Sequence, residues 1–298
     1  MESILHCSAV ALAAAIGCGE VTEIDSAALF PEGPWVEDSG LYYVQYAGHS
    51  LNHWDGDALR VLWQSEGCGP SAVAAFGEAL LVTCYDAGTL VEVSRAGDTL
   101  TTWDADSLGE PLVGPNDLTP DGAGGMFVTA SGPWESAPIA GKIYWLTPGV
   151  PAPEMVADDL HYANGIALGP QDGRIYVAES EAGRIVSFAV TEGPGLGDRR
   201  LFARLADLDP RAAPNPYPDG IEFGPDGNLW IGQYSSGRIL VAAPDATLAG
   251  ALDLPALAVP NLAFSADGKI LYVAAVDSYH APYPGRLLAV RLTGAASR

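Results

Sequence analysis

The sequence predicts an all-β protein, a six-bladed β-propeller whose four-stranded antiparallel blades surround a central metal-containing channel. Three observations favour this fold. A short strand-like phrase recurs six times, Gly (35) and Pro (23) are spread along all 298 residues, and helical periodicity is almost absent. Hydrophobic residues make up 48% of the chain and charged residues only 17%, which excludes a disordered or coiled-coil protein.

The recurring phrase consists of a glycine, one or two further residues, two apolar or aromatic residues, and then Val or Ile. Its six copies are Gly40–Val44, Gly77–Val82, Gly124–Val128, Gly173–Val177, Gly227–Ile231 and Gly268–Val273. Successive copies lie roughly 37 to 54 residues apart, which is close to the length of a propeller blade. A second glycine-led apolar phrase follows several copies, as in Gly88–Val93 and Gly183–Phe188. Each unit therefore holds several short antiparallel strands.

Asp-Gly pairs precede three of the central strands, at residues 172–173, 226–227 and 267–268. They predict type I′ hairpin turns, in which these aspartates form turns and have no catalytic role. The arginines that follow glycine at positions 184, 238 and 286 occupy one repeated strand position, and we interpret them as structural. Residues 21–25 are expected to form a strand beside residues 286–292, which would close the ring and remove two exposed sheet edges.

No linker divides the chain, so residues 21–298 are predicted to form one propeller domain, with residues 1–20 as an N-terminal segment packed on it. That segment contains an apolar run that ends in a lipobox-like Cys18, but it lacks the basic residues of a secretory signal. We therefore predict a cytoplasmic protein, with export as the alternative. No later stretch is long and apolar enough to predict a membrane span.

The four cysteines, at positions 7, 18, 68 and 84, form no CxxC pair and no zinc spacing, so we predict that they are reduced and buried. Acidic residues number 37 against 14 Lys and Arg, a formal charge of −23. This charge argues against a nucleic-acid partner. It fits either a bound cation or a solvated acidic surface. The expected partner is a small-molecule substrate, and the expected state is a monomer or small homo-oligomer.

Residues at equivalent positions in the innermost strands of a propeller lie at similar depth in its channel. Counting back about twelve residues from the Val or Ile that ends each phrase reaches Glu32, Asn116 and Asp219, and lies within one residue of Asn164. In blades two and six the same count falls near Gly69 and Pro260, with Ser71 and Asn261 close by.

Two carboxylates and two amide oxygens around one axis form a hard-oxygen set with a net charge of −2. Such a set favours Ca²⁺, and Mg²⁺ or Mn²⁺ as further candidates, over metals that prefer thiolates. Zn²⁺ and Fe²⁺ also remain open. The competing interpretation is that Asn and Asp before Gly are turn residues. Four of them at one register favour the metal site Glu32, Asn116, Asn164 and Asp219.

Four local motifs carry a resemblance to a known family: Glu32–Pro34, Pro115–Asp117, Asn164–Gly165 and Pro218–Gly220. Over residues 23–292 the chain resembles the senescence marker protein/gluconolactonase/regucalcin family of six-bladed propellers. The resemblance implies one divalent metal, often calcium, with Glu32, Asn164 and Asp219 as direct ligands. Asn116 would be a further ligand or would reach the metal through water or substrate. The related diisopropylfluorophosphatase has a similar set around its calcium.

One departure concerns substrate. Sugar-lactone members often carry an arginine two residues before the second motif's asparagine, and this chain has Gly114 there. A neutral or more apolar substrate therefore gains weight over a sugar acid lactone.

The resulting hypothesis is a metal-dependent hydrolase of carboxylic ester bonds, most simply a lactonase, in which the cation polarises the carbonyl. Asp219 would be the general base toward water or the nucleophile itself. The residues expected to contact substrate are Asn116, Ser71, Asn261, Trp134, Tyr217, His49 and His280. The aromatic residues 134, 217, 234 and 279 are interpreted either as a mouth lining or as packing.

Two other functions stay open. One is a phosphotriesterase-like or specialised-metabolism enzyme on the same metal site, since fold does not fix function. The other is a non-enzymatic propeller that binds calcium or another ligand. A metal-free propeller of the strictosidine synthase kind is disfavoured by the intact ligand set.

Overall fold

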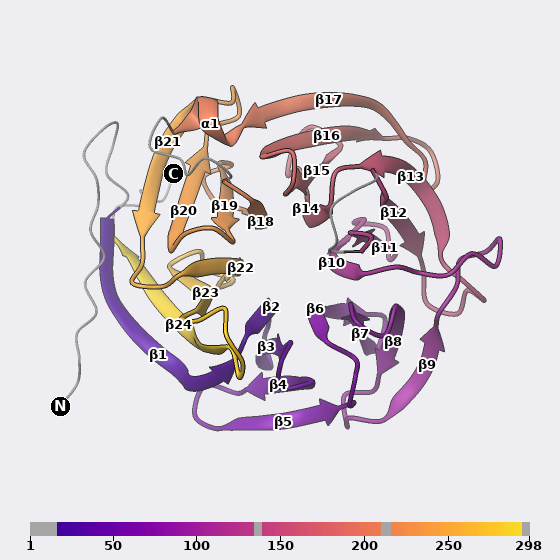
Figure 1. Cartoon of the computed structure of the whole chain (residues 1–298), viewed down its shortest axis with the longest axis horizontal. Coiled ribbons are helices and arrows are strands. Elements are labelled where there is room, and N and C mark those ends of the chain that lie inside the picture. The colour runs from indigo at the N-terminus through magenta and orange to yellow at the C-terminus, as the bar shows by residue number, and fades with distance from the viewer. Residues whose placement is uncertain (1–16, 134–138, 210–215, 294–298) are drawn as a thin grey trace.

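The chain folds into a ring of antiparallel sheets around a central axis (Figure 1). The computed structural model describes residues 17–133, 139–209 and 216–293. Four sheets have four strands each and one has eight. In each sheet the strands follow one another from the axis outward, with β2, β6, β10, β14, β18 and β22 innermost (Figure 1).

The eight-stranded sheet contains β2 (Pro31–Glu37), β3 (Gly40–Gln45), β4 (Ser50–Trp54), β5 (Leu59–Gln64), β6 (Pro70–Phe76), β7 (Ala79–Cys84), β8 (Thr89–Val93) and β9 (Thr99–Trp103). The next two sheets contain β10 (Pro115–Pro120), β11 (Met126–Ala130), β12 (Gly141–Leu146), β13 (Glu154–Leu160), and β14 (Ala163–Leu168), β15 (Arg174–Glu179), β16 (Arg184–Val190), β17 (Leu196–Arg204). The short helix α1 (Leu205–Leu208) leads to the last two sheets, which contain β18 (Pro218–Phe223), β19 (Leu229–Gln233), β20 (Arg238–Ala242), β21 (Leu248–Asp253), and β22 (Ala258–Phe264), β23 (Ile270–Val276), β24 (Pro284–Thr293) with β1 (Gly17–Leu29).

The ring closes as the sequence predicts. Strand β1 pairs antiparallel with β24, with Val21 opposite Val290 and Thr22 opposite Ala289. The eight-stranded sheet consists of two antiparallel runs of four strands, joined where Gly33 of β2 pairs in parallel with Ala72 of β6. Of the predicted N-terminal segment, residues 1–16 lie outside the described part of the chain.

The residue that ends each copy of the repeated phrase is fully buried: Val44, Val82, Val128, Val177, Ile231 and Val273 all have 0% exposure. Around them, apolar side chains of neighbouring sheets form shared clusters, such as Leu81 of β7 with Val128 of β11 and Tyr144 of β12. Burying one Val or Ile side chain is worth about 1.5–3 kcal/mol. The phrase therefore recurs because each copy supplies a residue to the core that holds neighbouring sheets together.

The three Asp-Gly turns form, but not in the predicted type I′ geometry. Gly173, Gly227 and Gly268 have positive φ, whereas the aspartates before them do not. Each aspartate instead accepts a hydrogen bond from the main-chain N–H two residues on, as Asp226 does from Asn228 at 3.1 Å. This local bond makes a single left-handed residue sufficient for the turn.

The repeated arginines are structural, as predicted. Arg184 contacts Glu179 at 2.6 Å, Arg286 contacts Asp277 at 2.7 Å, and Arg238 pairs with Asp253. Within the described part of the chain, no helix is long and apolar enough to cross a membrane.

Candidate functional site

The first residue of each innermost strand pairs with the last residue of the second strand of its sheet. This holds in all six cases: Pro31 with Gln45, Pro70 with Cys84, Pro115 with Ala130, Ala163 with Glu179, Pro218 with Gln233 and Ala258 with Val276. The pairing then becomes irregular in every sheet. Irregularities of this kind turn side chains out of the regular alternation of a strand.

In five of the six inner strands the residue in second position lines the cavity, whereas Val259 of β22 packs in a hydrophobic core cluster. Glu32, Asn116, Asn164 and Asp219 all hold this position, so the structure places the four predicted metal ligands at one register. Sequence counting put Gly69 and Pro260 at this level in the other two sheets. The strand pairing puts Ser71 and Val259 there instead.

The glycines that follow three of these residues are not turn residues. Gly33, Gly165 and Gly220 lie inside strands, each against the next innermost strand around the ring. A Cβ on Gly165 would lie 2.3 Å from the main-chain oxygen of Asp219, and one on Gly220 would lie 2.5 Å from Cγ of Asn261. The motifs therefore pair a polar side chain with the close approach of two sheets at the axis.

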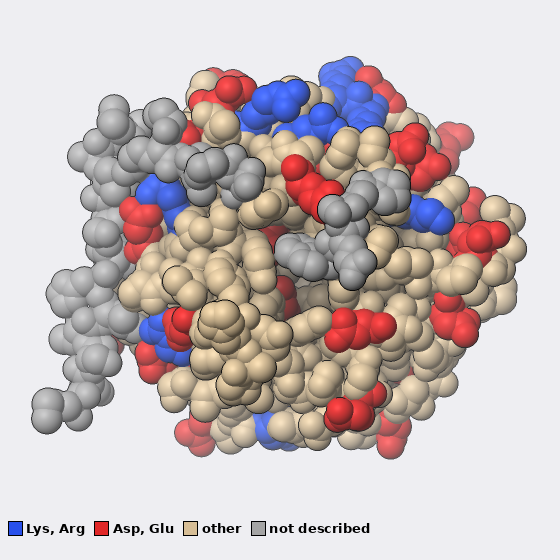
Figure 2. All heavy atoms as spheres, viewed as in Figure 1, with Lys and Arg blue, Asp and Glu red and all other residues tan. Residues whose placement is uncertain are grey.

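A cavity of about 360 Å³ opens on the channel, and the sequence identified seven of its lining residues: Glu32, Ser71, Asn116, Asn164, Tyr217, Asp219 and Tyr234. Figure 2 shows the face viewed in Figure 1, which is hollowed near its centre. The other predicted contact residues lie elsewhere. Trp134 is outside the described residues, and His49 and His280 sit in the β3–β4 and β23–β24 loops, outside the lining.

Asn261 lies on the channel wall but outside the lining, because it belongs to the layer next to Gly220. Its side-chain oxygen accepts the N–H of Leu262 at 2.7 Å, and its side chain also bonds Asp117. Asn261 therefore bonds residues next to the site, whereas the sequence predicted that it contacts substrate.

Two buried carboxyls dominate the electrostatics of the cavity. Glu32 is 9% exposed and Asp219 is 5% exposed. Burial raises the pKa of both groups well above the ordinary range, and the negative charges nearby raise them further. The charge of Asp219 acts on Glu32 in this way, and that of Asp117 acts on both. A cation between Glu32 and Asp219 would remove this penalty.

The two amides complete the set. Nδ2 of Asn116 donates to Oγ of Ser131 at 2.9 Å, so the amide oxygen is the end available to a cation. Asn164 hydrogen-bonds the carboxyl of Asp219 from the neighbouring sheet. Four oxygen donors with two negative charges fit a hard divalent ion. Among the described residues there is no group of three or more His, Cys, Asp or Glu that could hold a metal, so a cation bound between Glu32 and Asp219 would have to draw on the amide oxygens as well.

A second acidic pair escaped the sequence analysis. Asp117, next to Asn116, accepts N–H bonds from Leu118 at 2.9 Å and from Ile166 of the neighbouring sheet at 3.2 Å. Burial raises its pKa to about 7. Burial and then the charge of Asp117 raise the pKa of Glu222 to about 8. Asp117 stood in the predicted motif, but only the fold shows that it ties three innermost strands together.

Hydroxyl groups fix the main chain beside three of the four candidate ligands. Ser71 and Thr83 donate to the carbonyl oxygen of Asn116 at 2.9 and 2.6 Å. Thr129 donates to the carbonyl oxygen of Asn164 at 2.7 Å, and Ser180 donates to that of Pro218 at 2.6 Å. Each hydroxyl belongs to the preceding sheet, so the ring itself sets the spacing of the site.

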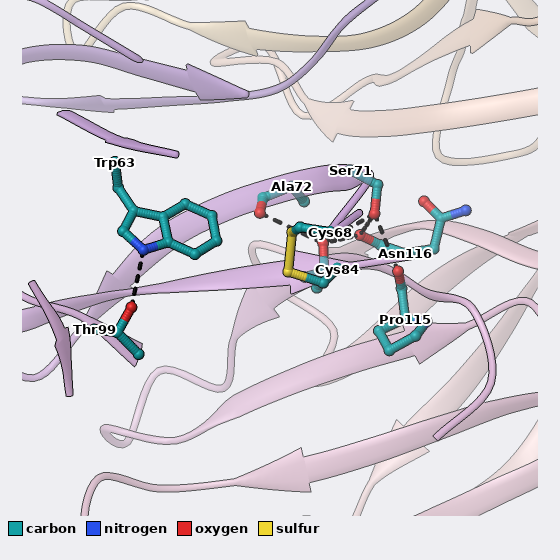
Figure 3. The surroundings of a disulfide bond; sticks show 9 residues. Trp63, Cys68, Ser71, Ala72, Cys84, Thr99, Pro115 and Asn116 are labelled. Carbon is teal, nitrogen blue, oxygen red and sulfur yellow. Dashed lines mark hydrogen bonds between the residues drawn. A yellow bond between two sulfur atoms is a disulfide. The ribbon is translucent and has the colours of Figure 1, made fainter. Parts of the chain in front are cut away.

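The prediction of reduced cysteines is wrong for Cys68 and Cys84, which form a disulfide (Figure 3). Cys68 precedes β6 and Cys84 ends β7, so the first pairing of this hairpin brings the two together. The bond lies beside Ser71, which points toward the main-chain oxygens of Pro115 and Asn116 (Figure 3). It therefore anchors one wall of the cavity. Cys7 is outside the described residues.

Comparison with known proteins assigns the chain to a family. The model of the SMP-30/Gluconolactonase/LRE-like region matches residues 30–277. The chain belongs to this family. A curated relative, lactonase drp35 of Staphylococcus aureus (strain MRSA252), is 25% identical over 189 residues, which are 59% of this chain and 54% of the relative. The chain thus spans about half the length of the curated relatives it matches.

Solved structures in the SMP-30/gluconolactonase group share the fold. A gluconolactonase from Xanthomonas campestris matches with a TM-score of 0.76 and 22% identity, covering 98% of this chain and 95% of that one. The calcium-binding protein regucalcin from Agrobacterium tumefaciens matches with a TM-score of 0.71 and 18% identity, covering 90% and 92%. At identities this low, the structural similarity establishes the propeller-like fold alone. The reaction has to be argued from the site.

Proposed function

We propose that the protein is a metal-dependent hydrolase that opens a lactone or cleaves a related carboxylic ester. The observation that carries the proposal is the placement of Glu32, Asn116, Asn164 and Asp219 at one register around one cavity. The lactonase and gluconolactonase relatives support the reaction class, and regucalcin supports calcium as the ion. We also count the eight-stranded sheet as two blades, which gives six.

In this proposal Glu32, Asn116, Asn164 and Asp219 hold the ion. When bound, a divalent cation would polarise the substrate carbonyl and stabilise negative charge on its oxygen. Asp219 would take the proton from the attacking water, because its carboxyl lies in the lining of the cavity. Asn164, bonded to Asp219, would hold that carboxyl in position.

Gly114 supports a substrate other than a sugar acid lactone. Its φ is +62°, and a Cβ there would lie 2.8 Å from the carbonyl oxygen of Gly132 and 2.9 Å from the ring of Tyr85. The place where sugar-lactone enzymes carry arginine is therefore filled by an aromatic ring.

The test is hydrolysis of a lactone panel beside an aryl phosphotriester, with the purified protein loaded with Ca²⁺, Mg²⁺ or Mn²⁺. Asp219→Asn is expected to lower kcat by a factor of at least about 100. Asp226→Asn, an exposed turn aspartate at the far end of the same strand, should act like the native chain. Full activity of Asp219→Asn would overturn the assignment. Turnover of the phosphotriester alone would favour the phosphotriesterase alternative, and a chelator without effect on activity or stability would favour the non-enzymatic one.

We further infer that the protein matures in an oxidising compartment. Disulfides persist outside the reducing cytosol, and Cys68–Cys84 is buried in the wall of the cavity. This favours export over the cytoplasmic location that the sequence analysis expected. Thiol labelling of the protein in lysates of its own cells, prepared under a thiol-blocking reagent, tests this: labelling of both cysteines would refute it.

A further inference from the structure

The mouth of the cavity is aromatic to an unusual degree. Seven of its fifteen lining residues are aromatic, and they come from sheets all around the ring: Phe30, Tyr46, Tyr85, Tyr162, Tyr217, Tyr234 and Tyr283. The rings contact one another in series. Their centroids are 5.4 Å apart for Phe30 and Tyr46, 6.4 Å for Tyr46 and Tyr85, and 6.5 Å for Tyr85 and Tyr162. We name this set the aromatic collar.

Three rings of the collar are held in place through their hydroxyl groups. Tyr46 donates to Asp86 at 2.8 Å, and Tyr162 donates to the hydroxyl of Tyr85 at 2.9 Å. Tyr85 in turn donates to the carbonyl oxygen of Gly132 at 3.3 Å. Because these hydroxyls are committed to protein partners, the surface that the three rings offer a ligand is mainly their carbon framework.

Charge at the mouth is of one sign. The lining contains four carboxylates, Glu32, Asp86, Glu181 and Asp219, and no Lys, Arg or His among the described residues. A divalent cation would neutralise the inner two, Glu32 and Asp219. The outer two carboxylates, Asp86 and Glu181, are both exposed and would remain as negative charges on the rim. The Lys and Arg side chains visible on this face lie toward its periphery (Figure 2).

Aromatic rings and carboxylates attract the same kind of ligand. The face of a ring is negative and binds ammonium groups, and carboxylates beside it add Coulomb attraction. An anionic substrate would meet rim carboxylates without a compensating cation, whereas a neutral one would use only the apolar surface. The charge of −23 on the whole chain also steers cations toward this surface.

We propose that the aromatic collar, with Asp86 and Glu181, selects substrates that carry an organic cation, an ammonium or quaternary ammonium group, next to the ester or lactone carbonyl. This inference rests on the proposed hydrolase function and specifies its substrate class. The cationic group would lie among the rings at the rim, and the carbonyl would reach down to Glu32 and Asp219.

The test compares two esters of the same shape. The first is 3-(trimethylammonio)phenyl acetate, and the second is 3-tert-butylphenyl acetate, its neutral isostere. We expect kcat/KM, corrected for the alkaline reactivity of each ester, to favour the cationic ester at least fivefold, roughly the value of a cation–aromatic contact. The preference should shrink with added salt, because the rim charges are exposed.

Variants of the rim connect the preference to the residues. Glu181→Gln and Asp86→Asn keep shape and hydrogen-bonding capacity, and each should reduce the ratio of cationic to neutral kcat/KM by about threefold. The matched control is Glu78→Gln, an exposed glutamate in the turn between β6 and β7, at the opposite end of the hairpin that carries Asp86. It should leave the ratio unchanged.

A binding measurement separates this inference from the hydrolase proposal. Calorimetry would compare (3-hydroxyphenyl)trimethylammonium with 3-tert-butylphenol, the alcohols released from the two esters. Tighter binding of the cation without hydrolysis of either ester would support the collar and refute the hydrolase. Hydrolysis of both esters at equal corrected rates would refute cation selection and leave the hydrolase standing. Equal ratios of cationic to neutral kcat/KM in the native chain and in both rim variants would also refute cation selection.

Discussion

Raising the pH of the cation-free protein should destabilise it, and a divalent cation should reverse this loss. The reason is a set of four carboxyls whose pKa values desolvation raises above those of the unfolded chain: the buried Glu32, Asp117 and Asp219, and the half-buried Glu222. The folded state therefore holds protons that the unfolded state has released. Stability from this source is complete below the ordinary pKa values and is lost as the pH rises through the folded ones.

Asp117 sets the scale of the effect. Its pKa rises from 3.8 to about 7, mainly because of burial. Between these values each pH unit removes about 1.4 kcal/mol of unfolding free energy. From pH 5 to pH 7 this one group therefore costs roughly 2 to 3 kcal/mol, against a total stability of about 5–15 kcal/mol for a typical protein. Glu222, with a pKa of about 8, extends the loss toward pH 8.

The assay is urea unfolding of chelator-treated protein at pH 5 and pH 8, with and without excess Ca²⁺. The cation should raise the midpoint more at pH 8 than at pH 5, because protons compete with it at the lower pH. Asp117→Asn should flatten the pH dependence of the cation-free protein, and Asp226→Asn should not. Equal stability of the cation-free native protein at both pH values would refute the electrostatic reasoning.

Three further outcomes follow from single contacts. Replacing Cys68 and Cys84 together by Ala should cost about 3 kcal/mol in urea unfolding, since the bond spans 16 residues; an unchanged midpoint would contradict this. Thr83→Val should cost about 1 kcal/mol and raise the half-saturating calcium concentration in a chelator competition, whereas Thr83→Ser should do neither. Glu179→Gln, which removes the charge between two arginines, should cost about 3 kcal/mol in the same unfolding assay, and a loss below the scatter of replicates would refute this.

The sequence predicted the depth of the site well because that depth follows the repeat. Core residues such as Val128 and Ile231 recur at a fixed distance from the inner strand, so counting back from them reaches Asn116 and Asp219. The count did not reach the second residue of the inner strand in units where turn and strand lengths differ. In the second unit it reached Gly69, two residues short of Ser71, since no single offset describes every pairing irregularity.

Contacts at the ends of strands were harder to predict. Cys68 and Cys84 meet only because one precedes β6 and the other ends β7, which no cysteine spacing motif describes. The collar did leave a signal. Tyr46, Tyr85 and Tyr234 each follow directly after the second strand of their unit, a repeated position as regular as that of the candidate ligands. His49 and His280 lie in the loops that supply Tyr46 and Tyr283 to the cavity lining, but neither histidine is part of that lining.

Cation binding and substrate selection, as proposed, depend on different parts of each sheet. Candidate ligands occupy the second position of an inner strand, where neighbouring sheets touch and hydroxyls such as Thr83 and Thr129 fix the main chain. The collar and rim occupy strand ends and loops, where Asp86 is exposed and accepts the hydroxyl of Tyr46. A substitution at the rim can therefore change which substrate enters without moving the oxygens that hold the cation. On this basis we expect substrate preference and cation affinity to vary independently: Glu181→Gln should alter the first and leave calcium binding unchanged.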